Sequence, residues 1–229
     1  MVAGLVPYVP GEQPSVANLV KLNTNENPYP PSPRALSAIR AAAEQGLQLY
    51  PDPESTTLRR AIAARHGLDA TQVFVGNGSD EVLAHAFFAF FQQRGPLLVP
   101  DITYSFYQVY CGLYGITQQV VPLDAALRVD VEAFARAQGQ DVAGVVVANP
   151  NAPTGIGIPL AQIERLLQLH PQRLCGFWGR NGDGPHQPVP EPAGGAHAVQ
   201  VAFIGRAARW VCMWASASDR RVEPCEEQL

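Results

Sequence analysis

The chain has 229 residues, of which 47% are hydrophobic, and a formal net charge of −4 at pH 7. This length suits one large domain, or one domain with an appendage, and the apolar content is typical of a globular protein. No apolar run approaches the length of a membrane span, and the acidic balance gives no reason to expect a nucleic-acid partner. The first residues lack the charged and apolar regions of a secretory signal, so we expect a cytoplasmic protein that binds neither nucleic acid nor membrane.

Two residue counts narrow the possible chemistry. The 4 cysteines include no C-x-x-C pair, so neither a metal site nor a disulfide framework is indicated. Lys21 is the only lysine among the 16 lysine and arginine residues. Any reaction that needs a lysine amine must therefore use Lys21 or a lysine of another chain.

The first 35 residues are rich in proline and are expected to be irregular. Residues 21–28 (KLNTNENP) are polar and turn-like, and the proline that follows Asn27 favours extended backbone there. The simplest interpretation of this stretch is a solvated N-terminal arm.

Two helices are predicted between the arm and the first strand. One covers residues 35–44, with Ser32 as its cap. Residues 50–53 (YPDP) predict an extended turn, and Ser55 is the expected cap of a second helix that stops at Gly67.

A glycine-rich turn at residues 76–81 (GNGSDE) separates a short strand, 73–75, from a helix that begins near Ser79. The N–H groups of the first helical turn and the positive end of the helix dipole would converge there, which favours binding of a phosphate. Ser79 would add a hydroxyl donor, whereas the Asp80 carboxylate would need a cationic partner such as a protonated ring nitrogen. The alternative is an ordinary capped helix start. A dinucleotide site is disfavoured, because Glu81 stands where its third glycine is required.

Short apolar runs alternate with helical patterns through the rest of the chain. Strands are predicted at 97–99, 118–122 and 144–148, and helices through 109–113, 131–137 and 160–169. The continuous apolar run at 144–148 suits a parallel strand that is covered on both faces. Polar loops follow two of these strands, at 101–107 and 149–155. We therefore predict an α/β fold with a mostly parallel sheet and flanking helices, and ligands in the crevice beyond the carboxyl ends of the strands.

Five segments, in this order, resemble the histidinol-phosphate aminotransferase family, pyridoxal-phosphate enzymes of the fold-type-I superfamily. These segments are residues 21–28, 50–52, 76–81, 101–105 and 149–155. The resemblance covers roughly residues 5–173 and implies an incomplete fold-type-I large domain, a pyridoxal 5′-phosphate cofactor and a homodimer. The reaction it implies belongs to histidine biosynthesis, the transfer of an amino group between histidinol phosphate and 2-oxoglutarate.

The resemblance also implies roles for individual residues. The residues that would contact the cofactor are Gly78, Ser79, Asp80, Tyr104, Asn151 and, from the neighbouring subunit, Tyr50. The glycine turn would hold the phosphate, Tyr104 would stack on the ring, and Asn151 would bond to the ring hydroxyl. Ala152 departs from the family, which often has asparagine in that position. The residues on the substrate side would be Asn25, Glu26 and Asn27.

The composition of the chain changes at about Leu174. All 3 tryptophans and three of the 4 cysteines lie beyond it, whereas all 7 tyrosines precede it. No helical or strand periodicity is evident after Leu174, and residues 182–190 are rich in glycine and proline. We therefore divide the chain into an N-terminal arm and small-domain segment (1–35), a partial cofactor-binding domain (36–173) and a poorly structured tail (174–229).

Catalytic residues of the resembled family are missing from the tail. The family carries there an aspartate facing the pyridine nitrogen, the lysine that binds the cofactor covalently, and a substrate-binding arginine, and none appears in its expected segment. Lys21 matches a residue of the arm segment and not that lysine. The resemblance thus implies an aminotransferase that is inactive as translated, and no catalytic residue is assigned.

A shift of reading frame would explain this loss. If the codons are read one base later, residues 191–196 permit NLLVVH, a buried strand, and residues 197–203 permit TLSKSHS. The Gln200–Val201 junction can then encode only lysine or arginine. We hypothesise that the tail is an out-of-frame reading of an aminotransferase gene; the alternative is a genuine divergent tail.

Three functional interpretations follow. The chain is a catalytically dead frameshift product, or an active enzyme whose sequence contains an error, or a non-catalytic fragment that binds or dimerises with an intact aminotransferase subunit. The expected small-molecule ligands are an amino-group donor and a 2-oxo acid. Missing strands would leave sheet edges and apolar helix faces uncovered, so we expect the isolated chain to aggregate.

Overall fold

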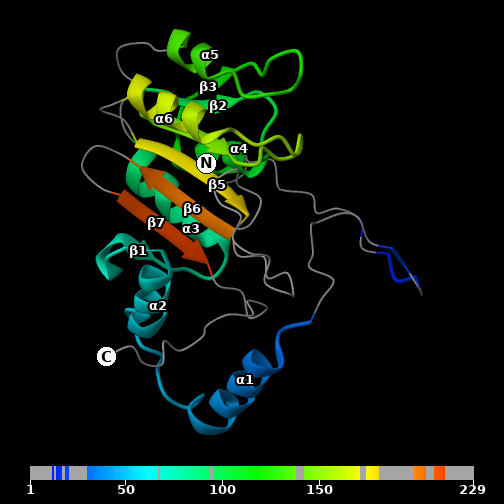
Figure 1. Cartoon of the computed structure of the whole chain (residues 1–229), viewed down its shortest axis with the longest axis vertical. Helices are drawn as coiled ribbons and strands as arrows, with labels where there is room; N and C mark the ends of the chain where they lie inside the picture. Colours follow the sequence, from blue (N-terminus) through cyan, green and yellow to red (C-terminus); the bar gives the residue numbers. More distant parts are fainter. Residues whose placement is uncertain are drawn as a thin grey trace.

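The computed structural model describes residues 12, 14–16, 19–20, 30–66, 68–92, 95–137, 142–170, 174–180, 199–204 and 209–214. Helices and strands alternate along most of this chain, which confirms the predicted α/β fold (Figure 1). The helices are α1 (Pro33–Gln45), α2 (Thr56–His66), α3 (Ser79–Ala86), α4 (Phe106–Tyr114), α5 (Val131–Arg136) and α6 (Leu160–Leu169), with a 3₁₀ turn η2 (Ala70–Gln72) and a π-helical segment η3 (Phe87–Phe91). The strands are β1 (Val73–Phe74), β2 (Leu97–Pro100), β3 (Gln118–Val121), β4 (Gly144–Ala148), β5 (Leu174–Arg180), β6 (Val199–Ile204) and β7 (Arg209–Trp214).

The described strands form one sheet in the order β1-β7-β6-β5-β4-β2-β3. β2 pairs in parallel with β3 and β4, and β4 pairs in parallel with β5. β6 is antiparallel to β5 and to β7, and β7 is parallel to β1. It follows that β1, β2 and β4 run in the same direction, so the segments that follow them leave the same edge of the sheet.

The central strands β2 and β4 are buried on both faces, as the apolar run of β4 predicts. Leu97 and Val146 pack with buried residues of α3, η3 and α4. Leu98 and Val145 point to the opposite face and pack with buried residues of α5 and α6. The alternation of side chains along each strand therefore builds two separate cores, one on each face of the sheet.

The two helices before the sheet are attached differently. α1 stands apart from the sheet and has no buried residue (Figure 1). Ser32 caps it as predicted, because its hydroxyl accepts from the Ala35 N–H at 3.2 Å. Ser55, the predicted cap of α2, stands directly before Thr56, and its carbonyl accepts from the Arg59 N–H at 2.9 Å. The Asp52 carboxylate also accepts from the Thr56 N–H, at 2.6 Å. No helix in the described ranges is long and apolar enough to cross a membrane.

Three strands lie in the tail, where the sequence was expected to be irregular. That expectation was wrong for β5, β6 and β7. Their sequences are rich in the β-branched and aromatic residues that favour strands, and β4 offers β5 an edge with which to pair. β5 therefore covers one edge of β4, whereas uncovered sheet edges were expected from the sequence. The other residues of the tail lie outside the described ranges, and the domain boundaries stay a prediction.

Candidate functional site

Hydrogen bonds join the loops that follow β1, β2 and β4 at one edge of the sheet. The Tyr104 hydroxyl, in the loop after β2, donates to Asp80 Oδ1 in the first turn of α3 at 3.1 Å. Asn151 Nδ2, in the loop after β4, donates to the Ile102 carbonyl at 2.8 Å. The three segments therefore contact one another at the edge of the sheet where the sequence predicts ligand binding.

The glycine turn, residues 76–81, has a backbone that few other residues would allow. Gly78 occupies the N-cap position of α3 with φ of 97°, and no side chain caps the helix. Glu81 accepts a hydrogen bond from the Asn77 N–H with its carboxylate. A Cβ at Gly76 would lie 2.9 Å from Glu81 Oε2, so only glycine lets this carboxylate approach. The first-turn N–H groups of α3 thus point into the turn without a side-chain acceptor, which suits an anion.

Two phenols hold the Asp80 carboxylate. In addition to Tyr104, the Tyr110 hydroxyl contacts Asp80 Oδ1 at 3.3 Å and the Asp80 carbonyl at 3.1 Å. Burial raises the pKa of Tyr110 well above its ordinary value, and the Asp80 charge raises it further. Tyr110 therefore stays protonated and donates to Asp80 across the physiological range.

Tyr104 presents its ring between α4 and the glycine turn. The ring is half-buried, lies edge-to-face with Tyr107 at 5.6 Å between centroids, and is nearly parallel to Phe106 at 6.0 Å. The hydroxyl bond to Asp80 and these ring contacts together fix its orientation. The position suits a platform for a flat ligand beside the anion-binding turn.

Asn151 is the most enclosed polar residue of the site, with 1% of its surface exposed. Its Nδ2 is committed to Ile102 and lies 3.3 Å from Thr154 Oγ1, whereas Oδ1 has no partner among the described residues. A second buried oxygen without a described partner, Thr103 Oγ1, lies in the loop that Asn151 contacts. Buried polar atoms without a partner are uncommon in folded proteins, and these two are consistent with a polar ligand that binds between the loops.

The sequence also assigned Tyr50 and three residues of the arm to the site. Tyr50 is fully exposed, at 101%, and packs against nothing in the described part of the chain. Asn25, Glu26 and Asn27 lie outside the described residues. No cluster of three or more potential metal ligands occurs within the described ranges.

The donor set fits the cofactor that the resemblance implies. Open N–H groups and the Ser79 hydroxyl suit a phosphate, the Tyr104 ring suits a flat heterocycle, and the buried Asn151 oxygen suits a polar ring substituent. The amine that would bind the cofactor covalently is not among them, because Lys21 is the only lysine of the chain.

Sequence reasoning missed two residues that shape the site. Glu81 was interpreted only as the residue that excludes a third glycine, yet it closes the turn onto Asn77. Tyr110 was not assigned a role. The spacing of Tyr104, Tyr107 and Tyr110, three residues apart near one helix, was the available signal, because such residues share a helix face.

Comparisons with known proteins agree with this geometry. A model of the family described as aminotransferase class I and II matches residues 17–175. A histidinol-phosphate aminotransferase of Gluconacetobacter diazotrophicus is 62% identical over 170 residues, which are 74% of this chain and 47% of that protein. Histidinol-phosphate aminotransferase 2 of Rhizobium meliloti is 61% identical over 171 residues, 75% of this chain and 48% of that protein. The chain thus spans about half the length of the curated relatives it matches.

The solved structures show the same fold. The histidinol-phosphate aminotransferase from Sinorhizobium meliloti, in complex with pyridoxal-5′-phosphate, superposes with a TM-score of 0.60 at 22% identity. The match covers 67% of this chain and 50% of that one.

Proposed function

Since the chain belongs to the class I and II aminotransferase family, we propose that its three contacting loops form the phosphate and ring side of a pyridoxal 5′-phosphate site. The observation that carries the proposal is the pair of long-range hydrogen bonds, Tyr104 to Asp80 and Asn151 to Ile102, which gather these loops. The relatives' names support histidinol phosphate as an ancestral substrate, and the resemblance of the sequence implies a 2-oxo acid as the other.

Each residue has a definite task in this proposal. The Ser79 hydroxyl and the N–H groups at the start of α3 hold the phosphate, and Gly78 gives the backbone the conformation that this requires. The Tyr104 side chain stacks on the cofactor ring, and Asn151 would form a hydrogen bond with a polar group at the edge of that ring. When bound, the cofactor supplies the electron sink for amino-group transfer.

The chain as translated holds its cofactor without a covalent bond. In amino-group transfer a lysine amine both attaches the cofactor and moves a proton. Lys21 is the only candidate, and it stands in the arm segment. We therefore expect no transaminase activity from this chain alone.

The site is tested with a ligand that needs no lysine. Pyridoxamine 5′-phosphate carries an amine in place of the aldehyde, so its binding is non-covalent. Calorimetric titration of the full chain should show that it binds at least about tenfold more tightly than pyridoxamine, because the phosphate contacts are lost in the latter. Equal affinities would contradict the proposal. A borohydride-stable adduct of pyridoxal 5′-phosphate on Lys21, together with turnover of histidinol phosphate, would contradict the expectation that this chain has no transaminase activity.

A shifted reading frame remains our explanation of the tail. The family model ends at residue 175, close to the change of composition at Leu174. Sequencing the gene over codons 170–210 tests this directly. Codons that cannot spell lysine across the Gln200–Val201 junction would rule it out and leave a genuine divergent tail. A gene whose uninterrupted frame does spell that lysine would mean that the frame change is a sequence error and that the real protein is an active enzyme.

An exposed apolar surface favours a second function, association with an intact aminotransferase subunit. Tyr50, Leu47 and Leu49 are 101%, 78% and 69% exposed, and α1 buries no residue. Apolar side chains gathered on one segment are typical of a surface that another chain covers. Co-expression of this chain with a tagged intact histidinol-phosphate aminotransferase subunit should give a mixed dimer. Recovery of only the intact homodimer would contradict this function.

A further inference from the structure

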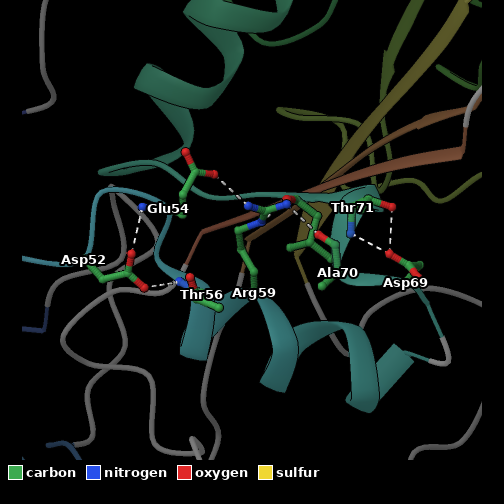
Figure 2. A network of polar contacts seen from close by, with 8 residues as sticks. Asp52, Glu54, Thr56, Arg59, Asp69, Ala70 and Thr71 are labelled. Carbon is green, nitrogen blue, oxygen red and sulfur yellow. Dashed lines mark hydrogen bonds and ion pairs between the residues drawn. The ribbon is translucent and has the colours of Figure 1, made fainter.

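Arg59, on α2, binds two segments of the chain, the η2–β1 stretch and the turn before α2 (Figure 2). Its Nε donates to the Val73 carbonyl at 2.9 Å, and Nη2 donates to the Ala70 carbonyl at 2.8 Å. Nη1 forms an ion pair with Glu54 Oε2 at 3.1 Å. The Arg59 side chain is 24% exposed and that of Glu54 is 74% exposed, so the two carbonyl contacts are the more enclosed ones.

Hydrogen bonds within η2 fix the segment on the sheet side that Arg59 binds. Asp69 caps η2, because its carboxylate accepts from the Thr71 N–H at 2.8 Å and from the Thr71 hydroxyl at 2.7 Å. Gln72 Oε1 accepts from the Asp69 N–H at 3.0 Å and completes a capping box. This turn presents the Ala70 and Val73 carbonyls to one guanidinium, whose planar fork can bind both at once.

The segment on the other side of Arg59 carries the exposed Tyr50. Asp52, two residues further along, accepts from the Glu54 N–H at 3.0 Å and from the Thr56 N–H at 2.6 Å. The Thr56 N–H is the main cause that lowers the pKa of Asp52 below its ordinary value. The extended turn before α2 is therefore fixed to the same helix that bears Arg59.

The contact of Arg59 with β1 holds the glycine turn in place, because β1, the strand that precedes the turn, is short. β1 has two residues and pairs with β7 only at Val73 and Phe74, at the edge of the sheet. Val73, whose carbonyl Arg59 holds, is three residues before Gly76 in the sequence. The other end of the turn is held by the bond between Asn77 and Glu81. Arg59 thus fixes the start of the turn and Glu81 its end.

We propose that Arg59 is a positioning residue for the phosphate-binding turn, and that it couples this turn to the segment that bears Tyr50. The proposal rests on the proposed function, in which residues 76–81 bind the phosphate. The described partners of Arg59 are Val73, Ala70 and Glu54. It would act through β1, by setting the direction in which the first-turn N–H groups of α3 point. Lysine is a poor substitute, since a single ammonium group does not reproduce the planar fork.

The test compares two ligands on four forms of the full chain. Pyridoxamine 5′-phosphate and pyridoxamine are titrated calorimetrically into the wild type, Arg59→Gln, Arg60→Gln and Glu54→Gln. Arg60 is the matched control, because it is the exposed neighbour on the same helix and its substitution changes the charge equally. Glu54→Gln removes the exposed ion pair and leaves both carbonyl contacts.

We expect Arg59→Gln to reduce the preference for the phosphorylated ligand by about tenfold or more, with the affinity for pyridoxamine unchanged. Arg60→Gln and Glu54→Gln should keep the wild-type preference. A general loss of stability would weaken both ligands alike, so an equal loss for the two ligands overturns the proposal, as does an unchanged preference in Arg59→Gln. If Arg59→Gln does not fold, the same comparison is made with Arg59→Lys: a reduced preference supports the proposal and a wild-type preference overturns it. A wild type without any phosphate preference refutes the proposed function itself.

Discussion

The Tyr104 hydroxyl donates a hydrogen bond of 3.1 Å to Asp80 Oδ1, across 24 positions of the sequence. This bond ties the loop after β2 to the first turn of α3. With Tyr110 on the same carboxylate oxygen, it gives Asp80 two phenol donors where the sequence suggested a cation. Tyr104 and the glycine turn, residues 76–81, are therefore one structural unit. A substitution in either part should change the stability of the other.

Tyr110 and Tyr107 offer a matched test of this unit. Both are buried on α4, but the Tyr110 hydroxyl contacts Asp80, whereas the Tyr107 hydroxyl has no described partner. Tyr110→Phe should lower the free energy of unfolding by about 0.5–1.5 kcal/mol, because it removes the hydrogen bonds that the Tyr110 hydroxyl makes to Asp80. Tyr107→Phe should be neutral or slightly stabilising, because it removes an unpaired buried hydroxyl. Urea denaturation measures both, and an equal loss of stability in the two variants would contradict the hydrogen-bond assignment.

Stability should fall in alkaline solution. Burial raises the pKa of Tyr107 and of Tyr110 above the ordinary value in the folded chain. Both phenols are protonated in folded and unfolded chains below about pH 10, so their full contribution is present there. Above that pH only the unfolded chain loses these protons, and the free energy of unfolding decreases as the pH rises. Urea denaturation between pH 8 and roughly 11 should give a shallower decrease for Tyr107→Phe than for the wild type. Identical profiles would show that Tyr107 ionises equally in both states.

Gly76→Ala should disturb the glycine turn. The new methyl group would lie 2.9 Å from Glu81 Oε2 and from Val82 Cγ2, so Glu81 must release Asn77 or the turn must widen. We expect a loss of about 1–3 kcal/mol in the free energy of unfolding, and a weaker preference for pyridoxamine 5′-phosphate over pyridoxamine. Gly157→Ala is the control, since its Cβ would meet Asn149 Oδ1 at 3.5 Å, an ordinary contact. Equal effects from the two alanines would mean that crowding at Gly76 is not the cause.

Removing the tail strands should promote aggregation. A chain ending at residue 173 lacks β5, which pairs with β4, and β7, which pairs with β1. The unpaired edge of β4 would be free to pair with other chains. Light scattering at equal concentration should show larger particles for this chain than for one ending at residue 214, which keeps every described strand. A monodisperse, cooperatively melting chain 1–173 would show that the tail strands are dispensable.

Local signals predicted the elements before residue 174 well. The limits predicted for 144–148 and 160–169 coincide with β4 and α6, because an unbroken apolar run and a helical period carry their own boundaries. Ser32 was likewise identified as a cap from its neighbours. Such features depend on residues that are close in sequence.

Features that depend on distant partners were missed. Arg59 binds Val73, 14 positions away, and Tyr110 binds Asp80, 30 positions away. The residues next to Arg59 and Tyr110 in the sequence do not predict which group accepts their hydrogen bonds. β5 was missed because its glycines weaken the strand signal, and the edge of β4 supplies what local propensity lacks.

The central claim, that the loops after β1, β2 and β4 recognise a phosphorylated ring, is tested most directly by amide hydrogen exchange. The full chain is labelled with and without saturating pyridoxamine 5′-phosphate. Exchange should slow in peptides covering residues 76–82, 101–107 and 149–156, while α5 and α6, on the opposite face of the sheet, stay unchanged. Unchanged exchange in residues 76–82, or protection confined to other elements, would contradict the account.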